Sequence, residues 1–184
     1  EAKIVRFISF DGLEIPAVYY KPPNASSDNK MPALVRVHGG PGGQARVGYR
    51  ASTQYLVNNG YAILDINNRG SGGYGKTFQT LDDQAHSKGD LDDCLAAIDW
   101  LKEQGHIDGG RIGILGGSYG GYMVMAAMAF RPDAFNVGVN IFGVTNWIRT
   151  LKSIPPWWEA ARESLYKDLG NPFTQEDYLY SISP

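Results

Sequence analysis

Short apolar runs alternate along this chain with segments whose apolar positions recur at helical spacing. Residues 33–37 and 61–66 are mainly apolar runs with the length of buried strands, each interrupted by one charged residue. A third run, 111–115, leads into a glycine-rich turn, and a fourth, 136–142, has the pattern of another fully buried strand. Because helical patterns separate these strands, the sequence predicts an α/β protein with a mostly parallel sheet.

The start of the chain has a different pattern. Residues 3–10 and 13–20 alternate or run apolar on either side of Asp11-Gly12, which predicts an antiparallel hairpin. A helix is predicted to begin near Asp90, because apolar side chains recur there every three or four residues. Those side chains are Leu91, Leu95, Ile98 and Leu101.

The turn after residues 111–115 carries the sequence Gly116-Gly117-Ser118-Tyr119-Gly120. A G-x-S-x-G pattern between a strand and a helix is typical of a nucleophile elbow, where the serine sits on a strained turn with its hydroxyl above the sheet. Residues 122–130 have the pattern of the helix that must follow. The glycines at 116 and 120 would let strand and helix pass closely. A chance glycine-rich turn is the alternative, and the flanking strand and helix argue against it.

A serine that attacks a carbonyl needs N–H donors for the developing oxyanion. The backbone amide of Tyr119 is the first candidate. The second is expected from the loop from His38 to Gly43, which follows a buried strand and whose glycines allow close backbone approach to a substrate. His38 itself is predicted to shape this loop by hydrogen bonding and not to act as a catalytic base.

A competing interpretation is dinucleotide binding. Residues 40–45 fit G-x-G-x-x-A after a strand, and Asp65 lies twenty residues further on. Residues 70–75 also match the glycine pattern, so it discriminates poorly in this chain. The fingerprint requires a helix that opens within the glycines, whereas residues 46–50 intervene before any helical pattern. Nucleotide binding is therefore the weaker alternative.

Composition narrows the function further. The chain has 184 residues, 43% of them hydrophobic, and a net charge of −2 without blocks of either sign, which indicates one domain and argues against nucleic acid or anionic lipid as partners. No stretch has membrane-spanning length, and no apolar leader opens the sequence. We expect a soluble cytoplasmic protein without a cofactor. The single cysteine, Cys94, lies in an apolar stripe and is expected to be a buried thiol.

Five segments together resemble the prolyl oligopeptidase family of serine peptidases, in particular its acylaminoacyl-peptidase and dipeptidyl-peptidase branches. They are residues 10–16, 38–41, 68–75, 89–93 and 116–122, and the resemblance spans nearly the whole chain. It implies an α/β-hydrolase fold, a three-layer sandwich with a mostly parallel sheet.

The resemblance also implies roles for individual residues. Ser118 corresponds to the nucleophile, and Tyr119 with Gly39 or Gly40 to the oxyanion donors. Val144 and Trp147, together with the ring of Tyr119, correspond to the substrate pocket. Trp147 could equally be a core or lid aromatic. Arg69 and Asp90 are expected to brace loops beneath the site.

Residues 145–183 lack clear periodicity and contain two proline-bearing turns and a crowd of aromatic side chains. We expect this segment to be an aromatic-rich excursion over the active site and not another strand–helix unit. The aromatic residues are Trp147, Trp157, Trp158, Tyr166 and Tyr178.

The α/β-hydrolase order places an acidic residue and then a histidine after the serine. All three histidines, His38, His86 and His106, precede Ser118. We therefore expect residues 1–184 to be a partial catalytic domain, truncated before the last strands and nearly inactive alone. The expected partners are a peptide substrate, the rest of the parent polypeptide with an N-terminal propeller, and a second copy paired through residues 136–142.

The sequence thus predicts a serine-type peptidase that, as a complete protein, cleaves short peptides by acyl transfer through Ser118. Two alternatives stay open. A carboxylesterase of the same fold would use the same elbow and oxyanion loop, and a catalytically inactive interaction fragment would keep the elbow only as packing.

Overall fold

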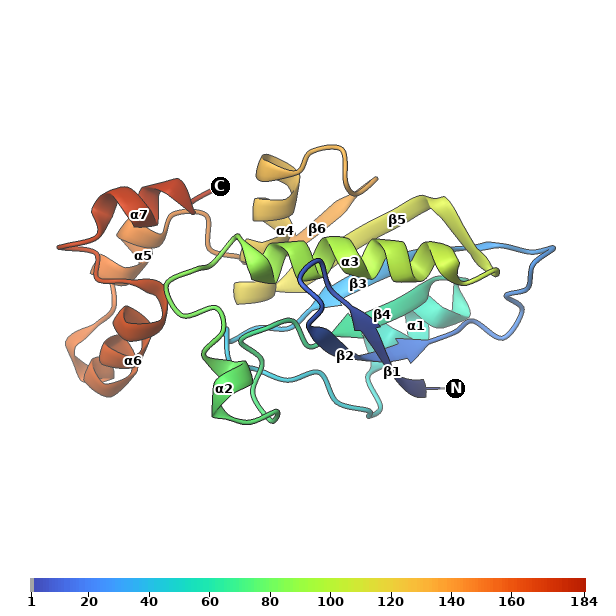
Figure 1. Cartoon of the computed structure of the whole chain (residues 1–184), viewed down its shortest axis with the longest axis horizontal. Helices are drawn as coiled ribbons and strands as arrows, with labels where there is room; N and C mark the ends of the chain where they lie inside the picture. Colours follow the sequence, from blue (N-terminus) through green and yellow to red (C-terminus); the bar gives the residue numbers. More distant parts are fainter. Residues whose placement is uncertain (1) are drawn as a thin grey trace.

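A six-stranded sheet in the order β1-β2-β4-β3-β5-β6 runs through the molecule (Figure 1). The computed structural model describes residues 2–184. The strands are β1 (Ala2–Ile8), β2 (Glu14–Tyr20), β3 (Met31–Val37), β4 (Ala62–Ile66), β5 (Ile107–Gly117) and β6 (Gly138–Ile141). β1 and β2 are antiparallel to their neighbours, whereas β4, β3, β5 and β6 are parallel to one another. The opening hairpin and the mostly parallel sheet are both confirmed.

Helices cover both faces of the sheet. They are α1 (Ala51–Asn58), α2 (Lys76–Gln79), α3 (Gly89–Glu103), α4 (Tyr119–Phe130), α5 (Trp147–Lys152), α6 (Glu159–Leu169) and α7 (Glu176–Ser181), with a 3₁₀ turn at Pro156–Trp158.

The two faces carry separate apolar clusters. Leu64 and Ile66 of β4 belong to the large core beneath α3 and α4, whereas Ile63 packs with Leu56 and Val57 of α1. Because successive strand residues point to opposite faces, α1 lies on the face opposite α3 and α4. α3 crosses in front of the sheet in Figure 1. The chain thus has the predicted three layers of an α/β-hydrolase fold.

α3 forms where the apolar spacing predicts it. Leu91, Cys94 and Leu101 are fully buried, so Cys94 is the core thiol that the sequence predicts. Asp90 stabilises the first turn, because its Oδ1 accepts hydrogen bonds from the backbone N–H groups of Lys88 (3.0 Å) and Leu91 (2.9 Å). The other carboxylate oxygen of Asp90 remains free for the site described below.

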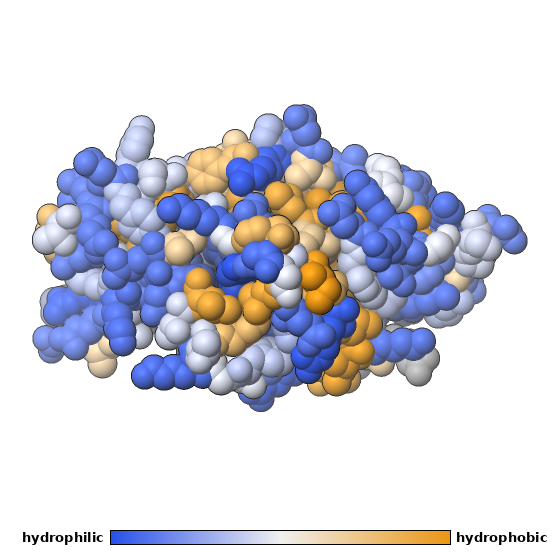
Figure 2. Space-filling view, viewed as in Figure 1, coloured by the Kyte–Doolittle hydropathy of each residue, from blue (hydrophilic) through white to orange (hydrophobic). Residues whose placement is uncertain are grey.

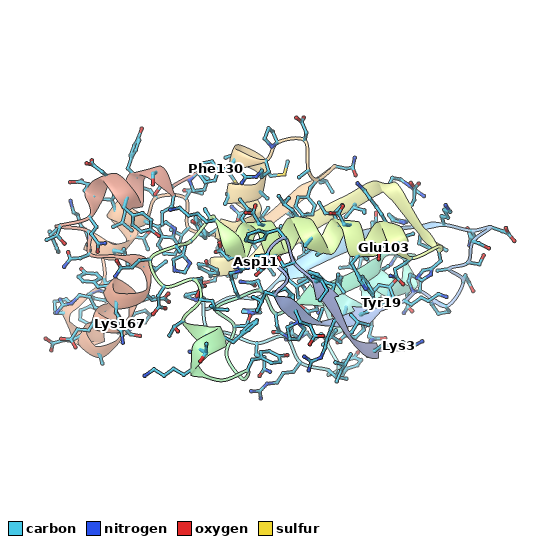
Figure 3. The ribbon with its side chains drawn as sticks, in the orientation of Figure 1. Lys3, Asp11, Tyr19, Glu103, Phe130 and Lys167 are labelled. Atoms are coloured by element: carbon cyan, nitrogen blue, oxygen red, sulfur yellow. The ribbon has the colours of Figure 1, made fainter. Side chains whose placement is uncertain are left out.

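An arginine braces the opening hairpin against α3. Arg69 donates to both carboxylate oxygens of Asp11 (2.9 and 3.0 Å), at the hairpin turn, and to both of Asp93 on α3. Ser9 donates a further hydrogen bond of 2.6 Å to Asp93. Asp11 lies in front of α3 in Figure 3. The predicted structural role of Arg69 is confirmed.

The prediction of a fully buried strand at residues 136–142 is wrong. β6 is shorter, and its side chains are half-buried or exposed, with Val139 46% and Ile141 41% exposed. The physical reason is its place in the sheet: within residues 2–184 β6 pairs with β5 only, and α4 covers one of its faces. Apolar composition alone does not distinguish such an edge from an interior strand.

Residues 147–181 form α5, the 3₁₀ turn, α6 and α7, joined by short loops, and extend from one end of the sheet (Figure 1). None of the helices within residues 2–184 is both long and apolar enough to span a bilayer. Exposed apolar side chains gather around the opening hairpin on the face shown in Figure 2, among them Ile4, Ile8 and Phe10.

Candidate active site

Ser118 lies on a strained turn between β5 and α4. Its φ of 56° and ψ of −119° fall in a region that residues other than glycine rarely adopt. Its side chain does not cap α4, and the residue is exposed. Backbone hydrogen bonds fix the turn from both sides, because Ser118 N–H donates to Ile141 (3.1 Å) and Tyr122 N–H donates to Ser118 (3.0 Å). The serine is thus held rigidly with an available hydroxyl, as in a nucleophile elbow.

The glycines on both sides of Ser118 are required by close backbone contacts. A Cβ on Gly116 would lie 2.4 Å from the carbonyl carbon of Gly120. A Cβ on Gly120 would lie 2.1 Å from the carbonyl oxygen of Val37. Both distances are far below van der Waals contact, so the elbow can approach β3 only with glycine at these positions.

The loop after β3 lies directly beside Ser118. A Cβ placed on Gly39 would be 3.4 Å from Cβ and 3.9 Å from Oγ of Ser118. Gly40 adopts a φ of +139°, which turns the loop sharply after this point. The backbone of the expected oxyanion loop therefore faces the serine side chain, and glycine leaves space for a small substrate group.

His38 holds this loop in shape. Its Nδ1 donates to the carbonyl oxygen of Gly39 (2.8 Å), and its Nε2 lies 2.7 Å from Oγ of Ser71. Burial lowers the pKa of His38, and only part of this effect is offset by the hydrogen bond to Gly39 and the charge of Asp65. The predicted role of His38 as a loop-shaping residue agrees with these contacts.

Two features that dinucleotide binding requires are not met in the structure. α1 begins at Ala51, several residues after the glycines, so no helix N-terminus opens within them. Asp65, which would have to contact a ribose, is 1% exposed and forms a buried ion pair with Arg36. The glycine pattern at residues 40–45 therefore belongs to the loop beside Ser118.

Of the three residues expected to line a substrate pocket, Trp147 and Tyr119 lie near each other at the start of α4. The ring of Trp147 lies 4.9 Å from that of Tyr122 and 6.2 Å from that of Tyr119, and Trp147 is 4% exposed. Val144 is half-buried against the same core. Gly143 packs on Gly121, which brings the chain after β6 over the start of α4. In this chain Tyr119 and Trp147 are buried, and their role in substrate binding stays a prediction.

A buried charged cluster lies beneath Tyr119. The Tyr119 hydroxyl donates to Oδ2 of Asp90 (2.7 Å) and accepts from Nδ1 of His86 (2.5 Å). On its other side, the His86 ring donates from Nε2 to Oδ1 of Asp168 on α6 (3.0 Å). Asp82 and Asp90 each place a carboxylate oxygen 3.6 Å from Nδ1 of His86. The contact with Tyr119 confirms the bracing role predicted for Asp90.

The cluster favours a proton on His86. Burial alone would lower the pKa of His86, but the hydrogen bonds to Asp168 and Asp90 and the charges of Asp90 and Asp82 outweigh it and raise the pKa to about 10. Burial also raises the pKa of Asp82 to about 7, against the opposing effect of His86. At neutral pH, His86 is therefore a buried cation among acidic side chains.

Asp82, His86 and Asp168 each offer a possible metal ligand atom, and these atoms lie within 4.8 Å of one another. The two ring nitrogens of His86, however, are directed at different partners, Tyr119 and Asp168, and both act as donors. A metal ion would have to replace one of these hydrogen bonds. The geometry as it stands suits a shared proton better than a metal ion.

Comparisons with known proteins identify the family of this chain. Residues 47–184 match the family model described as "Prolyl oligopeptidase family". The dipeptidyl aminopeptidase BIII of Pseudoxanthomonas mexicana is 38% identical over 163 residues, which are 88% of this chain and 24% of that protein. The chain belongs to the prolyl oligopeptidase family.

Solved structures agree with this assignment. An acylaminoacyl peptidase of Pyrococcus horikoshii superposes on the whole chain with a TM-score of 0.86 at 32% identity, and the chain covers 29% of it. A puromycin-hydrolyzing peptidase of Mycobacterium tuberculosis gives a TM-score of 0.89 at 26% identity, with 28% of it covered. The resemblance and the fold inferred from sequence are confirmed. The chain spans about a quarter of the length of these relatives.

Sequence reasoning missed the cluster around His86 in this family member. Asp82, His86 and Asp90 are spaced by four residues, which could have marked them as neighbours, although residues 81–87 form turns and not a helix. No sequence signal connects Asp168 to them, because it lies 82 residues beyond His86. Only the packing of α6 beside these turns brings the two together.

Proposed function

We propose that this chain carries the nucleophile and the oxyanion hole of a serine peptidase that acts on short peptides. The geometry of Ser118 carries the proposal: an exposed hydroxyl on a positive-φ turn, faced by the backbone of Gly39. Membership of the prolyl oligopeptidase family and the peptidases among its relatives support the same reaction.

In the proposed reaction, Oγ of Ser118 attacks the scissile carbonyl carbon and gives its proton to a general base. The oxygen that becomes negative is stabilised by N–H groups of Tyr119 and of Gly39 or Gly40, each worth about 10²–10³ in rate. As the first residue of α4, Tyr119 has no acceptor within the helix for its N–H. The amine leaves with the proton, and water then releases the acyl group from Ser118.

The substrate is proposed to lie between the oxyanion loop and the helical segment. A cavity of about 530 Å³ is bordered by Gly40 and Pro41 of that loop and by Leu165 and Asp168 of α6. Val144, which is half-buried, is proposed to contact the residue before the scissile bond, and the buried rings of Tyr119 and Trp147 are proposed to support that contact from beneath. This placement makes residues 145–183 a border of the active site.

The general base and its acidic partner are proposed to come from parts of the natural polypeptide outside residues 1–184. Each histidine of this chain is engaged elsewhere: His38 with the loop, His86 with the buried cluster and His106 with the Tyr19 hydroxyl (2.7 Å). The chain also spans only 24% of the P. mexicana relative, which leaves ample sequence for both groups. Near-inactivity of residues 1–184 alone, pairing of two copies through β6 and a cytoplasmic location stay predictions.

The test is fluorophosphonate labelling and turnover of a peptidyl anilide by the natural polypeptide that contains this chain. We expect labelling at Ser118, and for Ser118→Ala no labelling and a loss of at least about 10³-fold in turnover. The control is Ser26→Ala, an exposed serine in another loop, which should label like the unchanged protein. Turnover of a short acyl ester but not of the anilide would favour the carboxylesterase. If neither labelling nor turnover were observed, the proposal would be wrong and the remaining alternative would be a catalytically inactive interaction fragment.

A further inference from the structure

His86 connects the helical segment to the residue beside the candidate nucleophile. One side of its ring donates to Asp168 on α6, and the other donates to the hydroxyl of Tyr119 on α4. Its backbone N–H donates to the Tyr178 hydroxyl of α7 (3.2 Å). A single fully buried residue thus contacts three helices that are distant from it in sequence.

The adjacent backbone strengthens this connection. Gln84 N–H donates to the carbonyl oxygen of Asp168 (2.6 Å), and the Gln84 side chain donates to that of Lys167 (3.2 Å). The end of α6 is therefore docked on residues 84–86 by several hydrogen bonds. Lys167 marks this end of α6 in Figure 3, beyond the start of α3.

Tyr119 links the docking of α6 to the active site, because its side chain contacts His86 and its backbone amide lies beside Ser118. The ring of Tyr119 is 2% exposed and is fixed by Asp90, His86 and the neighbouring aromatic rings. Its backbone amide is the oxyanion donor proposed above. Since ring and amide belong to one residue, a shift of the ring would move the amide relative to Ser118. Misplacement of about 1 Å can cost about 100-fold in rate.

We propose that His86 is a positioning residue of the active site, which, held between Asp168 of α6 and the Tyr119 hydroxyl, couples the docking of the helical segment to the alignment of the oxyanion donor at Tyr119. This inference rests on the proposed function, because it assumes that Ser118 reacts. It assigns His86 no contact with substrate and no proton transfer in the reaction.

The protonation of His86 makes the coupling testable by pH. The ionisable groups that face His86 are Asp82 from the preceding turns, Asp90 of α3, Tyr119 of α4, Asp168 of α6 and Tyr178 of α7. As a cation the ring donates to Tyr119 and to Asp168 at once, whereas a neutral ring can donate to only one of them. Alignment should therefore be lost when His86 loses its proton.

The experiment measures kcat and KM for a peptidyl anilide with the natural polypeptide, per active site titrated by fluorophosphonate. We expect His86→Gln to lower kcat by about 10- to 100-fold, with KM changed less than about threefold. Tyr119→Phe, which keeps the ring and the amide, should lower kcat in the same direction. The matched control is His106→Gln, because His106 bonds Tyr19, which lies near the far end of α3 in Figure 3, and it should leave kcat unchanged.

A pH profile separates positioning from simple loss of fold. Asp168→Asn removes a carboxylate that stabilises the cation, so the alkaline decline of kcat should move to lower pH by about one to three units. Unchanged kcat per titrated site in His86→Gln, or an unmoved alkaline decline in Asp168→Asn, would overturn the inference. A natural protein that does not label at Ser118 would instead overturn the proposed function.

Discussion

The elbow and the helical segment are both fixed to the body of the domain, but by different kinds of contact. At the elbow, backbone packs on backbone: Gly120 lies against the carbonyl of Val37, and Gly143 against Gly121. At the helical segment, polar side chains and a buried cation make the connection, from His86 to Asp168. The first arrangement depends on the absence of side chains and is insensitive to pH. The second depends on charges and can be titrated.

The largest effect should follow from breaking the backbone contact. Gly120→Ala places a Cβ 2.1 Å from the carbonyl oxygen of Val37, and neither backbone can move without disturbing β3 or α4. We expect the free energy of unfolding to fall by about 5 kcal/mol, or no folded protein to be recovered. Denaturant unfolding of the purified variant measures the change.

The control for that prediction is Gly105→Ala. Nothing lies within 4 Å of a Cβ at Gly105, which is exposed after α3, so the variant should unfold like the unchanged protein. Equal stability of the Gly120 and Gly105 variants would show that the elbow can relax, and would remove the distinction between the two regions.

The same distinction explains which features the sequence could predict. The glycines of the elbow, the apolar runs of β3 and β4 and the stripe of α3 are local patterns with a direct physical cause. Asp168 contacts His86 across 82 residues, and no local pattern encodes that contact. The apolar run at β6 does not by itself reveal the exposure of its side chains, which could be expected only from its place as the last strand, because burial depends on which elements neighbour a strand.

A second prediction tests a buried ion pair whose cation, the guanidinium of Arg69, stays charged throughout the accessible pH range. Arg69→Met keeps an apolar stem but leaves Asp93, which is fully buried, without its partner. We expect a loss of about 3–4 kcal/mol in the free energy of unfolding, because a buried charge loses its counterion. For comparison, Arg111→Met removes an exposed pair with Asp108 and should leave the free energy of unfolding nearly unchanged. A similar cost for both variants would mean that burial does not decide the strength of these pairs.

A third prediction concerns the pH dependence of stability. The pKa of His86 is about 10 in the folded protein and near 6.5 in the unfolded chain, so its contribution is complete below about pH 6.5 and is lost as the pH rises toward 10. In that window the free energy of unfolding should fall by up to about 1.4 kcal/mol per pH unit. Denaturant unfolding between pH 5 and 10 gives the slope, and His86→Gln should flatten it above pH 7.

Asp82 offers a separate window for the same measurement. Its pKa of about 7 lies above the ordinary aspartate value of 3.8, so the protonated form is favoured in the folded state and stability declines as the pH rises from about 4 to 7. Asp82→Asn should flatten this lower window and leave a decline above pH 7. If both variants kept the slopes of the unchanged protein, the cluster around His86 would not be the origin of the pH dependence.

The smallest effect is expected from a polar contact at the surface of the helical segment itself. Lys152 of α5 lies 3.4 Å from Glu176 of α7 and 5.6 Å from the centre of the Phe173 ring, in positions open to water. Lys152→Met should change the free energy of unfolding by less than about 1 kcal/mol, and the difference should shrink further at high salt, because solvent already screens the exposed charges. Thermal unfolding at two salt concentrations measures this. Asp168→Asn, which weakens the buried contact with His86, is unfolded in the same way for comparison. If Lys152→Met lost as much stability as Asp168→Asn, the segment would be held by its surface charges as much as by the buried contact.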